Sequence, residues 1–85
     1  MNVGTRLREA RERLGITLQQ VSDSTKLSTT VLQHIERNEF DRLPGGIFTK
    51  GHLRAYAAKV RVNPEEVVDQ YLVQFPARVD RTQLS

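Results

Sequence analysis

Two helix-start signals in quick succession, at Thr17 and Ser28, are the feature that most constrains how this chain can fold. Thr17 is followed by Gln20 at the spacing of a capping box, in which each side chain bonds the backbone N–H of the other residue. Ser28 is a second residue of the type preferred at an N-cap. Two short helices joined by a turn around residues 25–27 are therefore expected, and they form a helix-turn-helix unit.

Three more helices are expected, at about residues 5–14, 47–60 and 63–75. Gly15 ends the first of them, and Pro64 opens the last, because glycine and proline favour these helix positions. The apolar positions of the three helices have helical spacing; they are Leu7, Ala10 and Leu14, then Leu53, Tyr56, Ala57 and Val60, then Val67, Val68, Tyr71, Leu72 and Phe75. No stretch alternates like a strand, so the sequence predicts an all-α, five-helix compact domain.

The turn-rich segment NEFDRLPGG connects the third and fourth helices. Its two large apolar residues, Phe40 and Leu43, are predicted to lie under the loop and fill the core. The chain is long enough for one domain only. We expect a helix-turn-helix domain at residues 1–75 and a polar tail, or the start of a linker, at residues 76–85.

The composition predicts a cytoplasmic location. The sequence has no cysteine, which suits a reducing compartment. Its first residues, MNVGTRLREARER, are charged and do not resemble a signal peptide. No apolar run approaches the roughly 20 residues of a membrane span, so no membrane contact is expected within this chain.

Catalysis is the least favoured class of function. The sequence has no glycine-rich phosphate loop, no cysteine nucleophile and only two histidines, His34 and His52. No carboxylate pair stands in an apolar setting, and a lone histidine does not make a metal site. We expect no catalytic residue, no metal, no cofactor and no small-molecule substrate.

The second helix of the helix-turn-helix unit is unusually poor in positive charge. Its outward positions are expected to be those that could contact DNA, together with the cation just beyond the helix: Thr29, Thr30, Gln33, His34 and Arg37. Thr and Gln can bond base edges. Residues 1–62 carry 11 Lys/Arg against 6 Asp/Glu, which favours an acidic partner. The arginines of the first helix, however, are expected to pair within it, as Arg8 with Glu12 and Glu9 with Arg13.

The fourth helix has an outward side that folding does not explain. If Leu53 and Tyr56 face the core, a stripe beginning at Phe48 and His52 lies roughly 100° away around the helix. The full predicted protein-binding set is Phe48, Lys50, His52, Arg54 and Lys59. An exposed Phe among cations is typical of a binding hot spot; the alternative is that Phe48 packs on Phe40. Gly51 within a helix suggests close approach of another backbone, from the fold or from a partner.

Residues 3–72 resemble the N-terminal cytoplasmic domain of RodZ-type bacterial cell-shape proteins, a divergent branch of the Cro/lambda-repressor-like helix-turn-helix family. The most telling segment is IERNEFDRLPGGIFTKGHLRAYA, which repressors lack. The resemblance implies a filament-binding surface on the fourth helix, anchored by two aromatic residues four positions apart. Phe48 matches the first anchor, and His52 stands where the second aromatic residue usually lies.

The resemblance implies a non-enzymatic adaptor that binds an actin-like filament protein of the MreB type. Full-length relatives continue through a linker into a membrane helix. The chain is then an N-terminal fragment or a stand-alone relative, and a parent protein that continues into such a helix would place this domain at the cytoplasmic face of the inner membrane. The alternative is a sequence-specific transcriptional regulator with duplex DNA as its partner, which uses the second helix of the helix-turn-helix unit.

Overall fold

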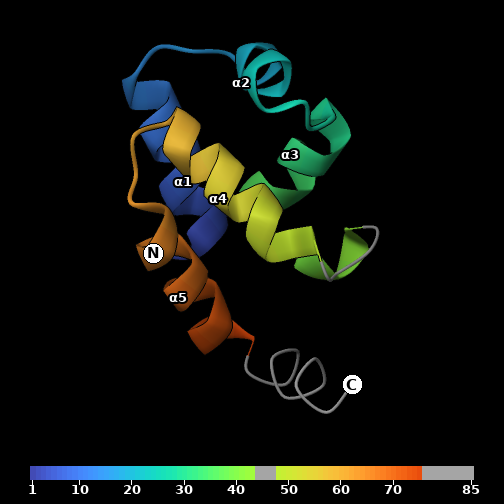
Figure 1. Cartoon of the computed structure of the whole chain (residues 1–85), viewed down its shortest axis with the longest axis vertical. Helices are drawn as coiled ribbons and strands as arrows, with labels where there is room; N and C mark the ends of the chain where they lie inside the picture. Colours follow the sequence, from blue (N-terminus) through green and yellow to red (C-terminus); the bar gives the residue numbers. More distant parts are fainter. Residues whose placement is uncertain (44–47, 76–85) are drawn as a thin grey trace.

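The computed structural model describes residues 1–43 and 48–75, which contain α-helices, one 3-10 helix and no strand. The bounds are α1 Val3–Arg13, α2 Leu18–Thr25, α3 Thr29–Glu36, η1 Phe40–Arg42, α4 Thr49–Lys59 and α5 Pro64–Gln74. α4 crosses the domain and packs against α2 and α5, while α1 contacts α3 and α5 (Figure 1). The predicted all-α fold with a helix-turn-helix is confirmed. The expected tail, residues 76–85, lies outside the described residues.

Local sequence signals fix where the helices begin. The Thr17 hydroxyl accepts a hydrogen bond from the Gln20 N–H at 3.1 Å, and the Gln20 side chain accepts one from the Thr17 N–H at 2.7 Å. This is the predicted capping box. Ser28 caps α3 by accepting from the backbone N–H of Val31 at 3.1 Å. Asn63 caps α5 in the same way.

The ends of α1 differ from the prediction. Asn2 caps this helix by accepting a hydrogen bond from the Thr5 N–H at 2.8 Å, so α1 begins at Val3 and not at Thr5. It ends at Arg13, and Leu14 is its C-cap. The prediction that Leu14 continues the buried stripe is therefore wrong, because this side chain lies where the chain turns towards Gly15 and is 41% exposed.

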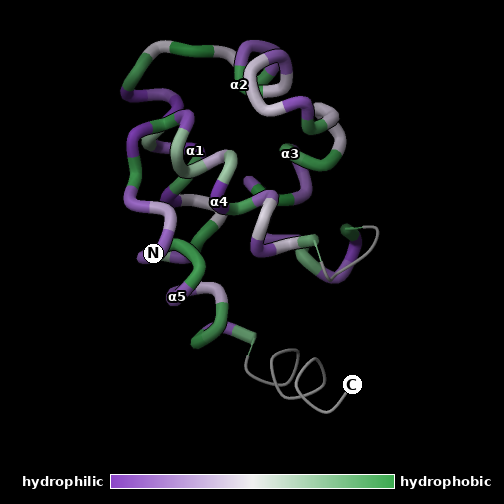
Figure 2. Tube along the Cα trace, viewed as in Figure 1, coloured by the Kyte–Doolittle hydropathy of each residue, from purple (hydrophilic) through white to green (hydrophobic). Residues whose placement is uncertain are grey.

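The hydrophobic core lies between the helices. Each helix contains both hydrophobic and hydrophilic residues (Figure 2). The predicted inward positions of α4 are all buried. Phe40 and Leu43 are buried as expected, at 1% and 7% exposure. Phe40 packs edge-on against Tyr71 and Phe75, with ring centroids 5.2 and 5.4 Å apart. These aromatic contacts join η1 to the end of α5.

α1 and α3 approach each other closely at Gly4. A Cβ atom at this position would lie 2.3 Å from the carbonyl oxygen of Ile35 and 2.9 Å from the backbone nitrogen of Asn38. The Asn38 side chain also accepts a hydrogen bond from the Gly4 N–H at 3.3 Å. Asn38 has a positive φ of 61°, which ends α3 sharply enough to bring this side chain to the start of α1.

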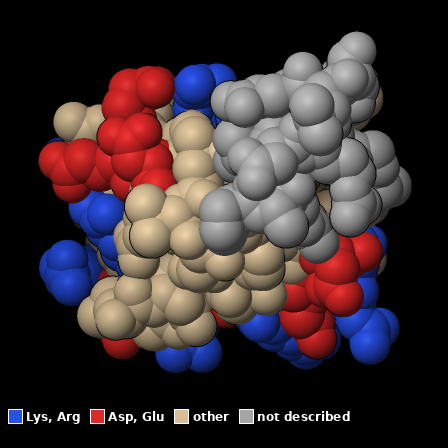
Figure 3. Space-filling model, turned by 90° about the horizontal axis from the view of Figure 1, so that it is seen from below, with Lys and Arg blue, Asp and Glu red and all other residues tan. Residues whose placement is uncertain are grey.

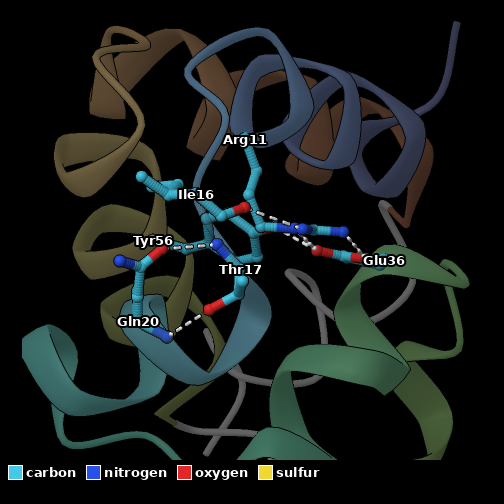
Figure 4. A network of polar contacts seen from close by, with 6 residues as sticks. All are labelled: Arg11, Ile16, Thr17, Gln20, Glu36 and Tyr56. Carbon is cyan, nitrogen blue, oxygen red and sulfur yellow. Dashed lines mark hydrogen bonds and ion pairs between the residues drawn. The ribbon is translucent and has the colours of Figure 1, made fainter.

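A polar network links α1, α3 and α4 inside the domain (Figure 4). The Arg11 guanidinium donates to both carboxylate oxygens of Glu36, at 2.7 and 3.3 Å, and to the backbone carbonyl of Ile16 at 3.0 Å. The Tyr56 hydroxyl donates to the same carboxylate. Burial, followed by the hydrogen bond to Glu36, raises the pKa of Tyr56. Hydrogen bonding to Glu36 raises the pKa of Arg11.

The ion pairs of α1 differ from those predicted. Among the described residues, α1 pairs with other helices: Arg11 with Glu36, and Arg6 with Glu66 at 2.8 Å. The predicted pairs within the helix, Arg8–Glu12 and Glu9–Arg13, are absent from this part of the structure. Arg6 and Arg11 bond carboxylates on α5 and α3, whereas an ion pair along one helix contributes only tenths of a kcal/mol.

Candidate protein-binding surface on α4

The position of α4 leaves one of its sides open to solvent. Its inward residues, Leu53, Tyr56 and Ala57, are completely buried, and Thr49 is 1% exposed. Successive residues of a helix are about 100° apart. The remaining positions therefore lie on the outward side, which we call the α4 surface: Phe48, Lys50, Gly51, His52, Arg54, Ala55, Ala58 and Lys59.

Phe48 is the most prominent apolar group of the α4 surface. It is the N-cap residue of α4, which begins at Thr49; the predicted first residue, Ile47, lies outside the described residues. The Phe48 side chain is 63% exposed, and its ring stacks on that of His52 with centroids 6.5 Å apart and planes inclined by 28°. The described residues show no ring contact between Phe48 and Phe40, whose ring packs against Tyr71 and Phe75.

Three cations lie on the α4 surface together with this stacked pair. Lys50 is partly exposed, while Arg54 and Lys59 are exposed. Arg54 donates through Nε and Nη2 to the two carboxylate oxygens of Glu65, at 3.0 and 3.4 Å. This contact lowers the pKa of Glu65 and raises that of Arg54. Within the described residues neither lysine has an ion-pair partner.

Gly51 lies on the α4 surface with open space around it. Among the residues that the structure describes, no atom beyond the adjacent helix backbone lies within 4 Å of a Cβ atom at this position. The described part of the fold therefore has no neighbouring backbone that requires this glycine. The other explanation for Gly51, close approach of a partner's backbone, stays a prediction.

The residues predicted to contact DNA lie on α3 and just after it. Thr30, Gln33 and Arg37 are exposed at helical spacing, whereas Thr29 is half-buried. His34 is also half-buried, and its Nδ1 lies 3.1 Å from a carboxylate oxygen of Glu39. That carboxylate brings negative charge beside one of the residues predicted to contact DNA, where it would repel phosphates.

The charges on one face of the molecule are mixed. In the view from below, the described Lys and Arg side chains alternate with Asp and Glu groups around an uncharged centre (Figure 3). Strong DNA binding depends on several phosphate contacts from Lys and Arg. The described part of this face has no such continuous basic area.

Glu65 is the residue of this region that the sequence did not reveal. It lies eleven positions after Arg54 and in another helix. In the sequence, its place in the first turn of α5 is fully explained by the helix dipole. The one usable signal is that α4 and α5 are joined by a short turn, which brings these two residues onto adjacent helix faces.

Comparison with known proteins identifies the family. A family model for the helix-turn-helix domain matches residues 6–67. The chain belongs to the helix-turn-helix domain family. Within this family, it is 32% identical over 69 residues to the cytoskeleton protein RodZ of Streptococcus pneumoniae (strain ATCC BAA-255 / R6). The match covers 81% of this chain and 25% of RodZ, so the chain spans about a quarter of the length of that relative.

A solved structure has the same helix-turn-helix fold. It is that of YmfM from Staphylococcus aureus, described as a candidate DNA-binding membrane protein. The TM-score is 0.78 at 39% sequence identity, and the match covers 81% of this chain and 84% of that one. The resemblance to RodZ-type N-terminal helix-turn-helix domains is thus confirmed. Among the described residues of the present chain, each helix is too short or too polar to span a bilayer.

Proposed function

We propose that this chain is a non-enzymatic adaptor that binds an actin-like filament of the MreB type through the α4 surface. It works in the cytoplasm, and at the inner membrane if its parent protein carries a membrane anchor. The exposed Phe48 ring, stacked on His52 and bordered by cations, is the observation that carries this proposal.

Three properties of the α4 surface support protein binding. The Phe48 ring is 63% exposed, so a partner that covers it removes a large apolar surface from water, which favours binding. Lys50 and Lys59 can pair with an acidic partner surface. The surface also lies on a helix whose opposite side is fixed in the core, so little conformational freedom is lost on binding. The name of the related RodZ, a cytoskeleton protein, agrees with a filament partner.

Two substitutions test the proposal by cosedimentation with purified MreB filaments. Phe48→Ala should weaken binding by about 30-fold, which corresponds to about 2 kcal/mol for a hot-spot residue. Lys50→Glu should weaken it as well, and this loss should shrink at high salt. Because both side chains lie outside the core, the variants should keep the helical circular dichroism of the wild type.

Matched controls separate the α4 surface from general effects. Val73→Ala removes another exposed apolar side chain, 80% exposed on α5, and Arg8→Glu reverses an exposed charge on α1. Both should bind like the wild type. Wild-type pelleting by Phe48→Ala and Lys50→Glu would rule out the α4 surface.

Duplex DNA is the second candidate partner, favoured by the exposed Thr30, Gln33 and Arg37 and by the description of YmfM. Titration of the chain with duplex DNA at two salt concentrations tests it. If DNA is the partner, binding should fall steeply with salt, and Thr30→Ala should weaken it by about 1–3 kcal/mol. An absence of binding at low salt would remove this candidate.

A further inference from the structure

One cation of the α4 surface already has a partner within the chain. Arg54 offers two donors to the two carboxylate oxygens of Glu65, at 3.0 and 3.4 Å. Guanidinium groups bind the carboxylates of other proteins with the same two-pronged geometry. A carboxylate that approaches Arg54 from outside therefore finds the Nε and Nη2 pair of donors occupied, and it is also repelled by the negative charge of Glu65.

The fold fixes the backbone of Glu65 at this place. The Asn63 side chain accepts a hydrogen bond from the Glu65 N–H at 2.9 Å, and Pro64 is the first residue of α5. The side chains of Arg54 and Glu65 are 47% and 67% exposed. Solvent screens such exposed pairs, so the contact contributes little to the stability of the fold. Rotation of the Glu65 side chain is enough to release Arg54.

We propose that Glu65 limits the affinity of the α4 surface, because its carboxylate occupies Arg54 and competes with a carboxylate of an acidic protein partner. This inference rests on the proposed function of the α4 surface. It predicts that only part of the positive charge of this surface is available for binding. The rest becomes available when Glu65 is neutralised or displaced.

Glu65→Gln tests this competition by removing the charge at nearly constant size. Its affinity for purified MreB filaments at low salt should be about three- to tenfold higher than that of the wild type, and the gain should shrink as salt rises. The structure supplies a matched control in Glu66, which is in the same turn and pairs with Arg6 at 2.8 Å, away from α4. Glu66→Gln removes the same formal charge and should leave the affinity unchanged.

A double-mutant cycle assigns the gain to Arg54. In an Arg54→Ala background, Glu65→Gln should give no increase in affinity, because the released donor is missing. The inference is wrong if Glu65→Gln binds no more tightly than the wild type. It is equally wrong if Glu66→Gln gives the same gain, which would be an effect of net charge, or if the gain persists without Arg54.

These outcomes are distinct from failure of the proposed function. If Phe48→Ala and Lys50→Glu bind like the wild type, the α4 surface is not the binding site, and the inference fails with it. If both lose binding while Glu65→Gln gains nothing, the proposed function stands and only the competition by Glu65 is excluded.

Discussion

Replacing Gly4 by alanine should destabilise the domain by about 3 kcal/mol or more, whereas the same change at Gly51 should stabilise it by about 0.5–1 kcal/mol. Both glycines lie in helices. At Gly4, the new methyl group would meet carbonyl oxygens of Ile35 and Glu36 at 2.3 and 2.8 Å. These are backbone atoms, so α1 and α3 would have to move apart. At Gly51 the methyl group would meet no atom of the described residues beyond the adjacent helix backbone.

Urea unfolding followed by circular dichroism measures the free energy of unfolding of both variants, and thermal unfolding measures their melting temperatures. For a domain of this size, each kcal/mol shifts the melting temperature by about 4–8 °C, so the two variants should separate widely. Wild-type stability of Gly4→Ala would contradict the close contact of α1 with α3. A loss of stability in Gly51→Ala would contradict the exposed helical position of Gly51.

Gly51→Ala also distinguishes folding from binding on the α4 surface. If a filament approaches the helix closely at this position, the added methyl group should weaken cosedimentation while it raises the melting temperature. If binding is unchanged, Gly51 has no role in the interface, and Phe48 and the cations alone carry it.

The two glycines show what the sequence could predict. It singled out Gly51, since an interior helical glycine is costly, and gave no reason to notice Gly4 at the start of α1. Whether a glycine is required depends on which backbone lies opposite it. That is set by the crossing of α1 and α3 and by the sharp turn at Asn38, which no local pattern encodes.

Signals that act within one turn of a helix were predicted correctly. The capping box of Thr17 and Gln20, the Ser28 cap and the proline start of α5 each depend on neighbours a few residues away. The inward side of α4 was also predicted, because helical periodicity alone determines it. Phe48 followed from the same periodicity, as it is the apolar residue left over when the inward positions are assigned.

Contacts between distant helices were not predicted. The arginines of α1 were expected to pair within that helix, yet Arg11 bonds Glu36, 25 positions away. One signal was available: Glu36 follows Ile35 and lies four positions after Leu32, at the edge of the buried stripe of α3. A second was the burial of Tyr56, whose hydroxyl requires a partner inside the domain.

Glu36→Ala should cost about 2–4 kcal/mol of stability, the largest loss expected from a polar side chain in this domain. The substitution removes the shared acceptor of the network and leaves the Arg11 guanidinium and the Tyr56 hydroxyl without it. The Arg11 and Glu36 side chains are only 16% and 10% exposed, so water cannot fully replace the lost bonds. Tyr56→Phe should cost less, about 1 kcal/mol, because no charge is left unpaired.

The Arg6–Glu66 pair is an exposed ion pair with which the buried Arg11–Glu36 pair can be compared. It has nearly the same length, 2.8 Å against 2.7 Å, but its side chains are 32% and 62% exposed. Glu66→Ala should therefore change the stability by about 0.5 kcal/mol or less. In Arg11→Met/Glu36→Leu, both charges are replaced together, and the double variant should be more stable than Glu36→Ala. Urea midpoints of the wild type, Glu36→Ala, Glu66→Ala and the double variant measure these differences. Equal losses for Glu36→Ala and Glu66→Ala would show that burial does not set the strength of the network.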